Sequence, residues 1–140
     1  MREILFKGQR TDNKEWIYGH YFTEVGRGID NSKNVIIHFI KDNFGTQIII
    51  PETVCQYTGL NDKNGVKIFE GDIFSEKWRT VVYQNSEGTY IVRFMTNPKY
   101  NKPVSLEKYI LQRDRAGCAE DCVIIGNIHD KETSEILINK

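Results

Sequence analysis

The chain has 140 residues, 39% of them hydrophobic and 27% charged, so it is large enough to bury a core without a disulfide or a metal. Its 19 basic and 19 acidic residues cancel, which excludes the global field that draws nonspecific binders to nucleic acid, although not a local patch. Three cysteines without framework spacing argue against a secreted disulfide scaffold. The charged N-terminus lacks a signal-peptide core, and "VIIHFI" is far shorter than the roughly 20 residues of a membrane helix, so we expect a soluble cytoplasmic protein.

The first part of the chain alternates apolar and polar residues with a period of two, which is typical of strands. The runs at residues 4–6 and 15–22 are joined by the polar, turn-prone "GQRTDNK". Farther along, "NVIIHFI" and "TQIIIP" flank "KDNFG", which predicts a hairpin in which Gly45 supplies a permissive backbone.

The second part continues the pattern. The runs "TVVYQ" and "TYIVRFM" are joined by "NSEG", which predicts another hairpin with Gly88 at its turn. The segment "VSLEKYILQ" is compatible with a strand or a short helix, and periodicity alone does not decide between them. The apolar "DCVIIGNI" predicts a strand, and Asp130 in "DKETSEIL" is a cap candidate for a short terminal helix.

Many short strands separated by polar turns predict a mainly β fold, a barrel or a sandwich with minor helix. A boundary is expected near Pro51. Residues 1–53 then form an N-terminal region of β-hairpins, which packs on a small barrel formed by residues 54–140, and the two parts make one compact domain.

The stretch "QYTGLNDKNGVKIFEGDIF" at residues 56–74 poses the main chemical question. With Gly65 at position 6 of a calcium loop, Asp62 and Asn64 would fall at ligand positions 3 and 5. Leu60 and Gly71 would then occupy positions 1 and 12, where carboxylates are needed. The pattern therefore does not favour calcium.

A tight hairpin explains the same residues better. Asn64-Gly65 is the preferred pair for a two-residue type I′ turn, because both central positions need positive φ. Folding the chain there would place Asp62 opposite Lys67, so that opposite charges pair near the tip. We therefore predict a hairpin centred on this pair.

Glu70 and Asp72 share a strand face and could form a catalytic carboxylate pair. Nothing else in the sequence completes such a site, since it has no nearby histidine and no activated nucleophile. The favoured interpretation is a Gly-Asp turn in which Asp72 accepts hydrogen bonds from loop amides.

Cys118 and Cys122, with His129 nearby, raise the question of zinc. A fourth ligand is not evident, and Cys122 precedes an apolar strand in which a buried thiol is ordinary. His20 and His38 lie in alternating strands and are expected to be packed or solvent-facing. We therefore predict no metal, no cofactor and no catalytic residue.

Basic and aromatic residues are interleaved in residues 99–115 and in the strand just upstream of them. Such a mixture can bind single-stranded nucleic acid by charge and base stacking, and small β-barrels do so repeatedly. The candidate face consists of Arg93, Lys99, Tyr100, Lys102 and Tyr109. The alternative is a solvated basic face with aromatic residues turned to the core.

Three stretches, "MREILFKGQR", "PETVCQYTGLNDKNGVKIFEGDIF" and "VIIGNIH", are together similar to the YopX family of phage and prophage proteins, over effectively the whole chain. The resemblance implies an all-β protein with an SH3-like barrel in its latter part, encoded by a bacterial virus or an integrated one. It carries over no catalytic residue. The sequence departs from the family pattern at His129, where an aromatic residue is usual, and in the C-x₃-C at 118–122.

These observations predict a non-enzymatic protein-interaction or small assembly module that acts in the cytoplasm of a bacterial host. Its expected partners are further copies of itself and a host or phage protein, without a membrane. The alternative is a single-stranded nucleic-acid-binding β-barrel, and a small hydrolase built on Glu70 and Asp72 ranks third.

Overall fold

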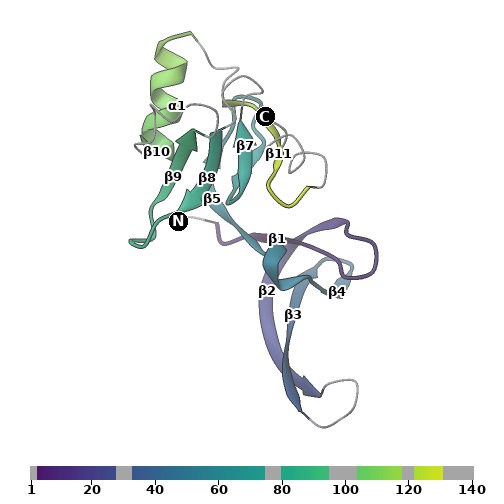
Figure 1. The fold of residues 1–140 in the computed structure, drawn as a ribbon. Helices are drawn as coiled ribbons and strands as arrows, with labels where there is room; N and C mark the ends of the chain where they lie inside the picture. Colours follow the sequence, from purple (N-terminus) through teal and green to yellow (C-terminus); the bar gives the residue numbers. More distant parts are fainter. Residues whose placement is uncertain (1–2, 28–32, 75–79, 95–103, 118–121, 131–140) are drawn as a thin grey trace. The chain divides into compact units, whose positions relative to one another are not determined.

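The computed structural model describes residues 3–27, 33–74, 80–94, 104–117 and 122–130. These residues form a mainly β protein with two antiparallel sheets, as the period-two pattern predicts (Figure 1). The chain divides into two compact units, Met1–Tyr57 and Thr58–Lys140.

The first unit is one antiparallel sheet in the order β4-β3-β2-β1-β5, and a short 3-10 helix precedes its last strand. Its elements are β1 (Phe6–Gln9), β2 (Trp16–Arg27), β3 (Asn34–Asp42), β4 (Gly45–Ile48), η1 (Pro51–Thr53) and β5 (Cys55–Asn61). Strand β5 continues past Tyr57 into the second unit, where it forms a hairpin with β6.

Close backbone packing makes the core of the first unit. Ile40 and Ile49 are 0% and 1% exposed. They lie over positions where only glycine fits, since a Cβ on Gly8 would collide with the Ile49 side chain and one on Gly19 with the Lys41 carbonyl. Glycine in a strand often marks such a close approach.

The hairpin predicted around "KDNFG" is confirmed. Strands β3 and β4 pair from Phe39↔Ile48 to Asp42↔Gly45, and Gly45 has a φ of 137°. The Asp42 carboxylate accepts the Phe44 N–H at 2.8 Å, which ties the turn to its own first residue.

The second unit contains a five-stranded antiparallel sheet in the order β10-β9-β8-β7-β11. Its elements are β6 (Lys67–Phe69), β7 (Asp72–Phe74), β8 (Thr80–Gln84), β9 (Tyr90–Phe94), β10 (Val104–Ser105), α1 (Leu106–Arg115) and β11 (Ile124–Asn127). The predicted hairpin at "NSEG" and the predicted strand in "DCVIIGNI" are both confirmed. Closure of this unit into an SH3-like barrel stays a prediction.

The ambiguous segment "VSLEKYILQ" is a strand and then a helix. Val104 and Ser105 pair with β9, and the Ser105 hydroxyl then accepts the Lys108 N–H at 3.2 Å, capping α1. Helix α1 lies against β9 and β10 (Figure 1). Its residues Leu106 and Tyr109 are buried in the core. The helix predicted after Asp130 lies outside the described residues.

The type of turn predicted at Asn64-Gly65 is wrong, although the hairpin itself is present. Gly65 has a φ of 80°, but Asn64 does not have a positive φ, as a type I′ turn requires. The Gly65 N–H donates to the Asp62 carbonyl, and the Asp62 N–H donates to the Val66 carbonyl. Asp62 therefore pairs with Val66 rather than with Lys67.

A side chain selects this wider turn. Asp62 Oδ1 accepts the N–H groups of Asn64 and Val66 at 2.9 and 2.8 Å. Asn85 organises the β8–β9 turn in the same way, because its Oδ1 accepts the N–H groups of Glu87 and Thr89. Both turns thus use an Asp or Asn side chain at the first position and a glycine three residues later.

Candidate functional site

The Gly-Asp step at residues 71–72 is a hydrogen-bonded corner. Asp72 is 1% exposed. Its Oδ2 accepts the Phe69 N–H at 2.8 Å, and its Oδ1 accepts the Asn127 side-chain amide at 2.9 Å. Since both carboxylate oxygens bind groups of the protein itself, the structure agrees with the predicted turn in which Asp72 accepts amide hydrogen bonds.

Asn127 extends this corner into a cluster between β7 and β11. Its Nδ2 also donates to the Glu70 carbonyl, its Oδ1 accepts the His129 N–H, and its own N–H donates to Asp130. Asp72 belongs to "EGDIF" and Asn127 to "VIIGNIH". Two of the three stretches that carry the family resemblance therefore meet here, in contacts that hold strands together.

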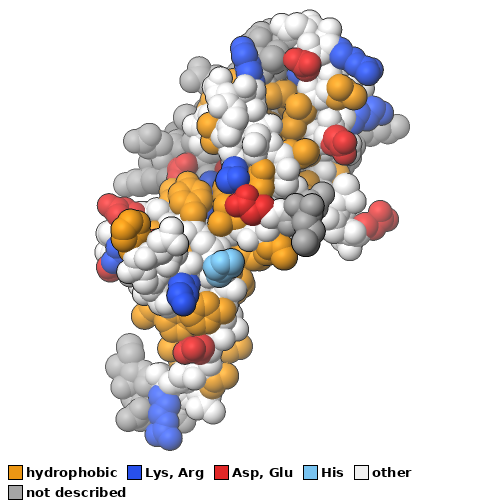
Figure 2. Space-filling model, turned by 180° about the vertical axis from the view of Figure 1, so that it is seen from behind, with side chains coloured by type: hydrophobic (Ala, Val, Ile, Leu, Met, Phe, Trp, Pro, Cys, Tyr) orange, Lys and Arg blue, Asp and Glu red, His pale blue; other side chains and the backbone are white. Residues whose placement is uncertain are grey.

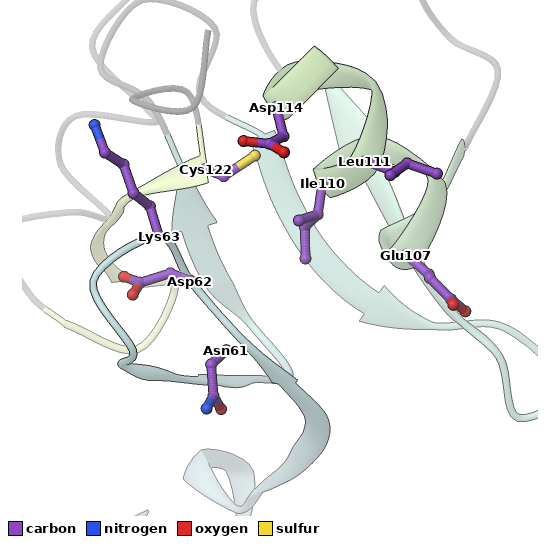
Figure 3. Close-up of a pocket in the computed structure, with 8 residues that line it drawn as sticks. All are labelled: Asn61, Asp62, Lys63, Glu107, Ile110, Leu111, Asp114 and Cys122. Carbon is purple, nitrogen blue, oxygen red and sulfur yellow. The ribbon is translucent and has the colours of Figure 1, made fainter. Parts of the chain in front are cut away.

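A cavity of about 420 Å³ lies between helix α1 and the β5–β6 hairpin, a volume in the range of small-molecule sites (Figure 3). Ile110 points toward the hairpin in this view, whereas Glu107 and Leu111 point away from it. The residues that line the cavity are Asn61, Asp62, Lys63, Glu107, Ile110, Leu111, Asp114 and Cys122. Asp62 already accepts three backbone N–H groups, including that of Ile124 at 3.4 Å, so it acts here as a structural acceptor.

The zinc question rests on Cys122 and His129 within the described residues, because Cys118 lies outside them. Cys122 is 3% exposed and part of the apolar core, as the sequence suggests for a thiol before an apolar strand. No group of three His, Cys, Asp or Glu side chains in the described part of the chain could hold a metal ion.

The residues of the candidate nucleic-acid face differ in their exposure to solvent. Tyr109 is 2% exposed and stacks on Phe74 with ring centroids 5.9 Å apart, so its ring is not accessible to a base. Arg93 is exposed, and its guanidinium lies 4.9 Å from the centroid of Tyr83. Lys99, Tyr100 and Lys102 lie outside the described residues.

An exposed apolar surface lies on the β2–β3 hairpin. The two strands pair in register from His20↔Lys41 to Arg27↔Asn34. Because paired residues share a face and alternate residues along a strand do too, one side of the hairpin is defined by the register. This side, here named the hairpin face, consists of His20, Phe22, Glu24, Gly26, Val35, Ile37, Phe39 and Lys41.

An aromatic pair lies at the centre of the hairpin face. Phe22 and Phe39 stack with ring centroids 5.2 Å apart. Val35 on the same face is 41% exposed. Ile48 of β4 pairs with Phe39 and is 49% exposed. Figure 2 shows hydrophobic side chains gathered over this hairpin, with basic, acidic and histidine side chains among them.

The opposite side of the hairpin packs on the core of its unit at its base, where Ile40 pairs with Tyr21 and is 0% exposed, and it is apolar and exposed toward its end. The Tyr21 hydroxyl lies 2.6 Å from His38 Nδ1, and the two rings stack. Farther along, Val25 and Ile36 pair directly and are 72% and 65% exposed. The end of the hairpin thus exposes apolar side chains on both sides.

The arrangement as a whole is that of a mainly β protein with an exposed apolar hairpin and a buried acid–amide cluster. A family model described as YopX protein matches residues 5–137, nearly the whole chain, and the protein belongs to this family. A comparison with curated proteins found no match. Within the described residues, no helix has the length and apolar character needed to cross a membrane.

Sequence reasoning did not single out the hairpin face. The alternation of apolar residues in β2 and β3 was visible, but it shows only which residues share a side, not whether another layer covers that side. The length of β2 was the available signal, since 12 residues exceed the usual strand of about 5–6.

Proposed function

We propose that this protein is a non-enzymatic protein-interaction module or small assembly component, encoded by a phage or prophage and acting in the cytoplasm of its bacterial host. The observation that supports an interaction role is the exposed apolar side of the β2–β3 hairpin. Monomeric soluble proteins rarely expose large contiguous apolar patches, and those that exist often mark interaction sites. Further copies of the chain and a host or phage protein are the proposed partners.

The engagement of the acidic residues supports the non-enzymatic part of the proposal. Asp72 and Asp62, the carboxylates that the sequence singled out for catalysis or metal binding, both accept hydrogen bonds from the protein's own amides. A general base must instead reach a substrate proton. Glu70 alone would be left to act, without the second carboxylate that the hydrolase hypothesis needs.

The alternative proposal, a single-stranded nucleic-acid binder, has less support. Its stacking residue Tyr109 belongs to the core. Arg93, exposed and stacked over Tyr83, is one basic–aromatic pair of the kind that can stack on bases. The formal net charge of zero also gives no general attraction to phosphate.

Capture from a lysate of phage-infected host cells tests the proposal. The purified chain is the bait, with and without nuclease, beside two single variants. Ile37→Lys places a charge on the hairpin face, and Val25→Lys places the same charge on the opposite side of the same hairpin. We expect a discrete partner that survives nuclease, is retained by Val25→Lys and is lost with Ile37→Lys.

A different pattern would favour nucleic acid. Retention of single-stranded DNA or RNA that weakens steeply with salt, and that is lost on Tyr100→Ala or Lys102→Ala, would contradict the proposed function. Equal capture of the partner by both lysine variants would remove the hairpin face from the interaction.

A further inference from the structure

We propose that the hairpin face docks on the hairpin face of a second copy of this chain, with the two hairpins packed antiparallel. The inference rests on the proposed interaction role and specifies its first partner. It follows from the exposure of a two-stranded arm and from the order of charges along the hairpin face.

The arm is the end of the hairpin, residues 24–27 paired with residues 34–37. Strand β1 pairs with β2 only as far as Gly19, and β4 pairs with β3 only from Phe39 onward, so no third described strand flanks the arm. A two-stranded hairpin is marginally stable in water, and packing on a further layer is what makes one stable. The arm is therefore stabilised by a partner that covers one of its two apolar sides, and the order of charges on the hairpin face indicates that side.

The hairpin face is ordered in rows across its two strands. His20 and Lys41 form a basic row, followed by the aromatic row of Phe22 and Phe39. The next row holds Glu24, paired with Ile37. A basic row and an acidic row thus flank the aromatic row on opposite sides.

This order is self-complementary in one orientation. A two-fold axis through the aromatic row, lying between the two sheets and perpendicular to the strands, reverses the row order in the second copy. Phe22 and Phe39 then meet their own counterparts. Glu24 faces His20 of the second copy and lies diagonally from Lys41 of the second copy, so a Glu24 carboxylate approaches a Lys41 ammonium at both ends of the contact.

The alternative two-fold orientation, with the strands of the two hairpins parallel, is disfavoured by the same residues. It would place His20 on Lys41 of the second copy and Glu24 on Ile37. The acidic side chain would then lose its basic partner. Charge order therefore selects the antiparallel packing, as unlike charges select register in other interfaces.

Nothing in the overall charge opposes this association. The chain has a formal net charge of zero, so two copies do not repel each other at long range. Facing sheets pack about 10 Å apart with interdigitated side chains, a spacing that the aromatic row and the Val35 and Ile37 side chains can fill.

A charge-swap pair tests the inference on the full chain. Light scattering after gel filtration at micromolar concentration should give a mass of about twice 16.3 kDa for the natural sequence. The Glu24→Lys substitution would bring a second basic side chain against the basic row of an identical copy, and Lys41→Glu would bring two acids together. Each variant alone should raise the dimer Kd at least about tenfold.

Mixing the two variants should restore the dimer. In a Glu24→Lys chain bound to a Lys41→Glu chain, both diagonal contacts again join opposite charges. We expect the mixture to form a heterodimer with a Kd close to that of the natural sequence. Glu87→Lys, an exposed charge reversal in the β8–β9 turn, serves as the control and should leave the dimer unchanged.

Three outcomes would overturn the inference: a mass of 16.3 kDa alone for the natural sequence, a dimer insensitive to both variants, or a mixture that does not associate. Its failure is separable from failure of the proposed function. A monomer whose capture of a nuclease-resistant partner is lost on Ile37→Lys would keep the interaction role and replace the second copy by that partner.

Discussion

The β2–β3 hairpin of the first unit and the five-stranded sheet of the second unit share one sequence pattern, yet they use their apolar residues in opposite ways. In the sheet, Phe74, Val82 and Val92 are 0% exposed. In the hairpin, the paired Val25 and Ile36 are 72% and 65% exposed. Alternation thus determines which residues share a side, while burial depends on whether another layer, such as helix α1, packs on that side.

Truncating one phenylalanine in each region should give the largest difference in stability between the two regions. Phe74 is fully buried and stacks on Tyr109, so Phe74→Ala should lower the free energy of unfolding by about 3–5 kcal/mol. Phe22 is half-buried on the hairpin face, and Phe22→Ala should cost about 1 kcal/mol in dilute monomer. Urea denaturation monitored by circular dichroism measures both values.

Protein concentration is the control for this pair. The loss for Phe74→Ala should be the same in dilute and concentrated samples, since it arises within one chain. If the hairpin face is covered by a second copy, the loss for Phe22→Ala should grow with concentration. Equal losses for the two variants in dilute protein would mean that the hairpin is as well packed as the sheet.

The elements that could be predicted from the sequence are those governed by local rules. The hairpins around Gly45 and Gly88 follow from turn residues between β-branched runs, and both are present. Helix α1 could also have been predicted from the sequence, because Ser105 is a capping residue and the apolar residues Leu106, Tyr109 and Ile110 follow a helical spacing.

Features that depend on distant partners could not be predicted. The contact of Asp72 with Asn127 joins positions 55 residues apart, and no local pattern reveals it. Pair preference predicts a two-residue turn at Gly65, but the Asp62 side chain selects a wider turn by accepting two of its amides. The burial of Tyr109 could not be predicted either, because burial of a helix face depends on the sheet beneath it.

A substitution at Gly65 tests the second unit at a single backbone position. Gly65 has a φ of 80°, and a Cβ added to it would meet no other atom within 4 Å, so strain rather than a clash decides the cost. Gly65→Val should destabilise the second unit by about 1 kcal/mol or more, since a β-branched residue resists positive φ.

Gly65→Asn is the matched control for this turn. Asparagine tolerates the left-handed region, so the loss of melting temperature should be clearly smaller than that for valine. Differential scanning calorimetry compares the three proteins. Equal melting temperatures for Gly65→Val and the natural sequence would contradict the positive φ at this position.

The smallest effect is expected at the end of the hairpin. Ile36 is 65% exposed on the side opposite the hairpin face, and threonine keeps the β-branched shape that strands favour. Ile36→Thr should therefore change the free energy of unfolding by no more than about 0.5 kcal/mol. It should also leave the dimer mass unchanged, because the proposed contact uses the other side of the same two strands. A loss of stability as large as that of Phe74→Ala, or a shift to monomer, would show that this second apolar side is covered as well, and would move the interaction surface from the Phe22 and Phe39 row to Val25 and Ile36.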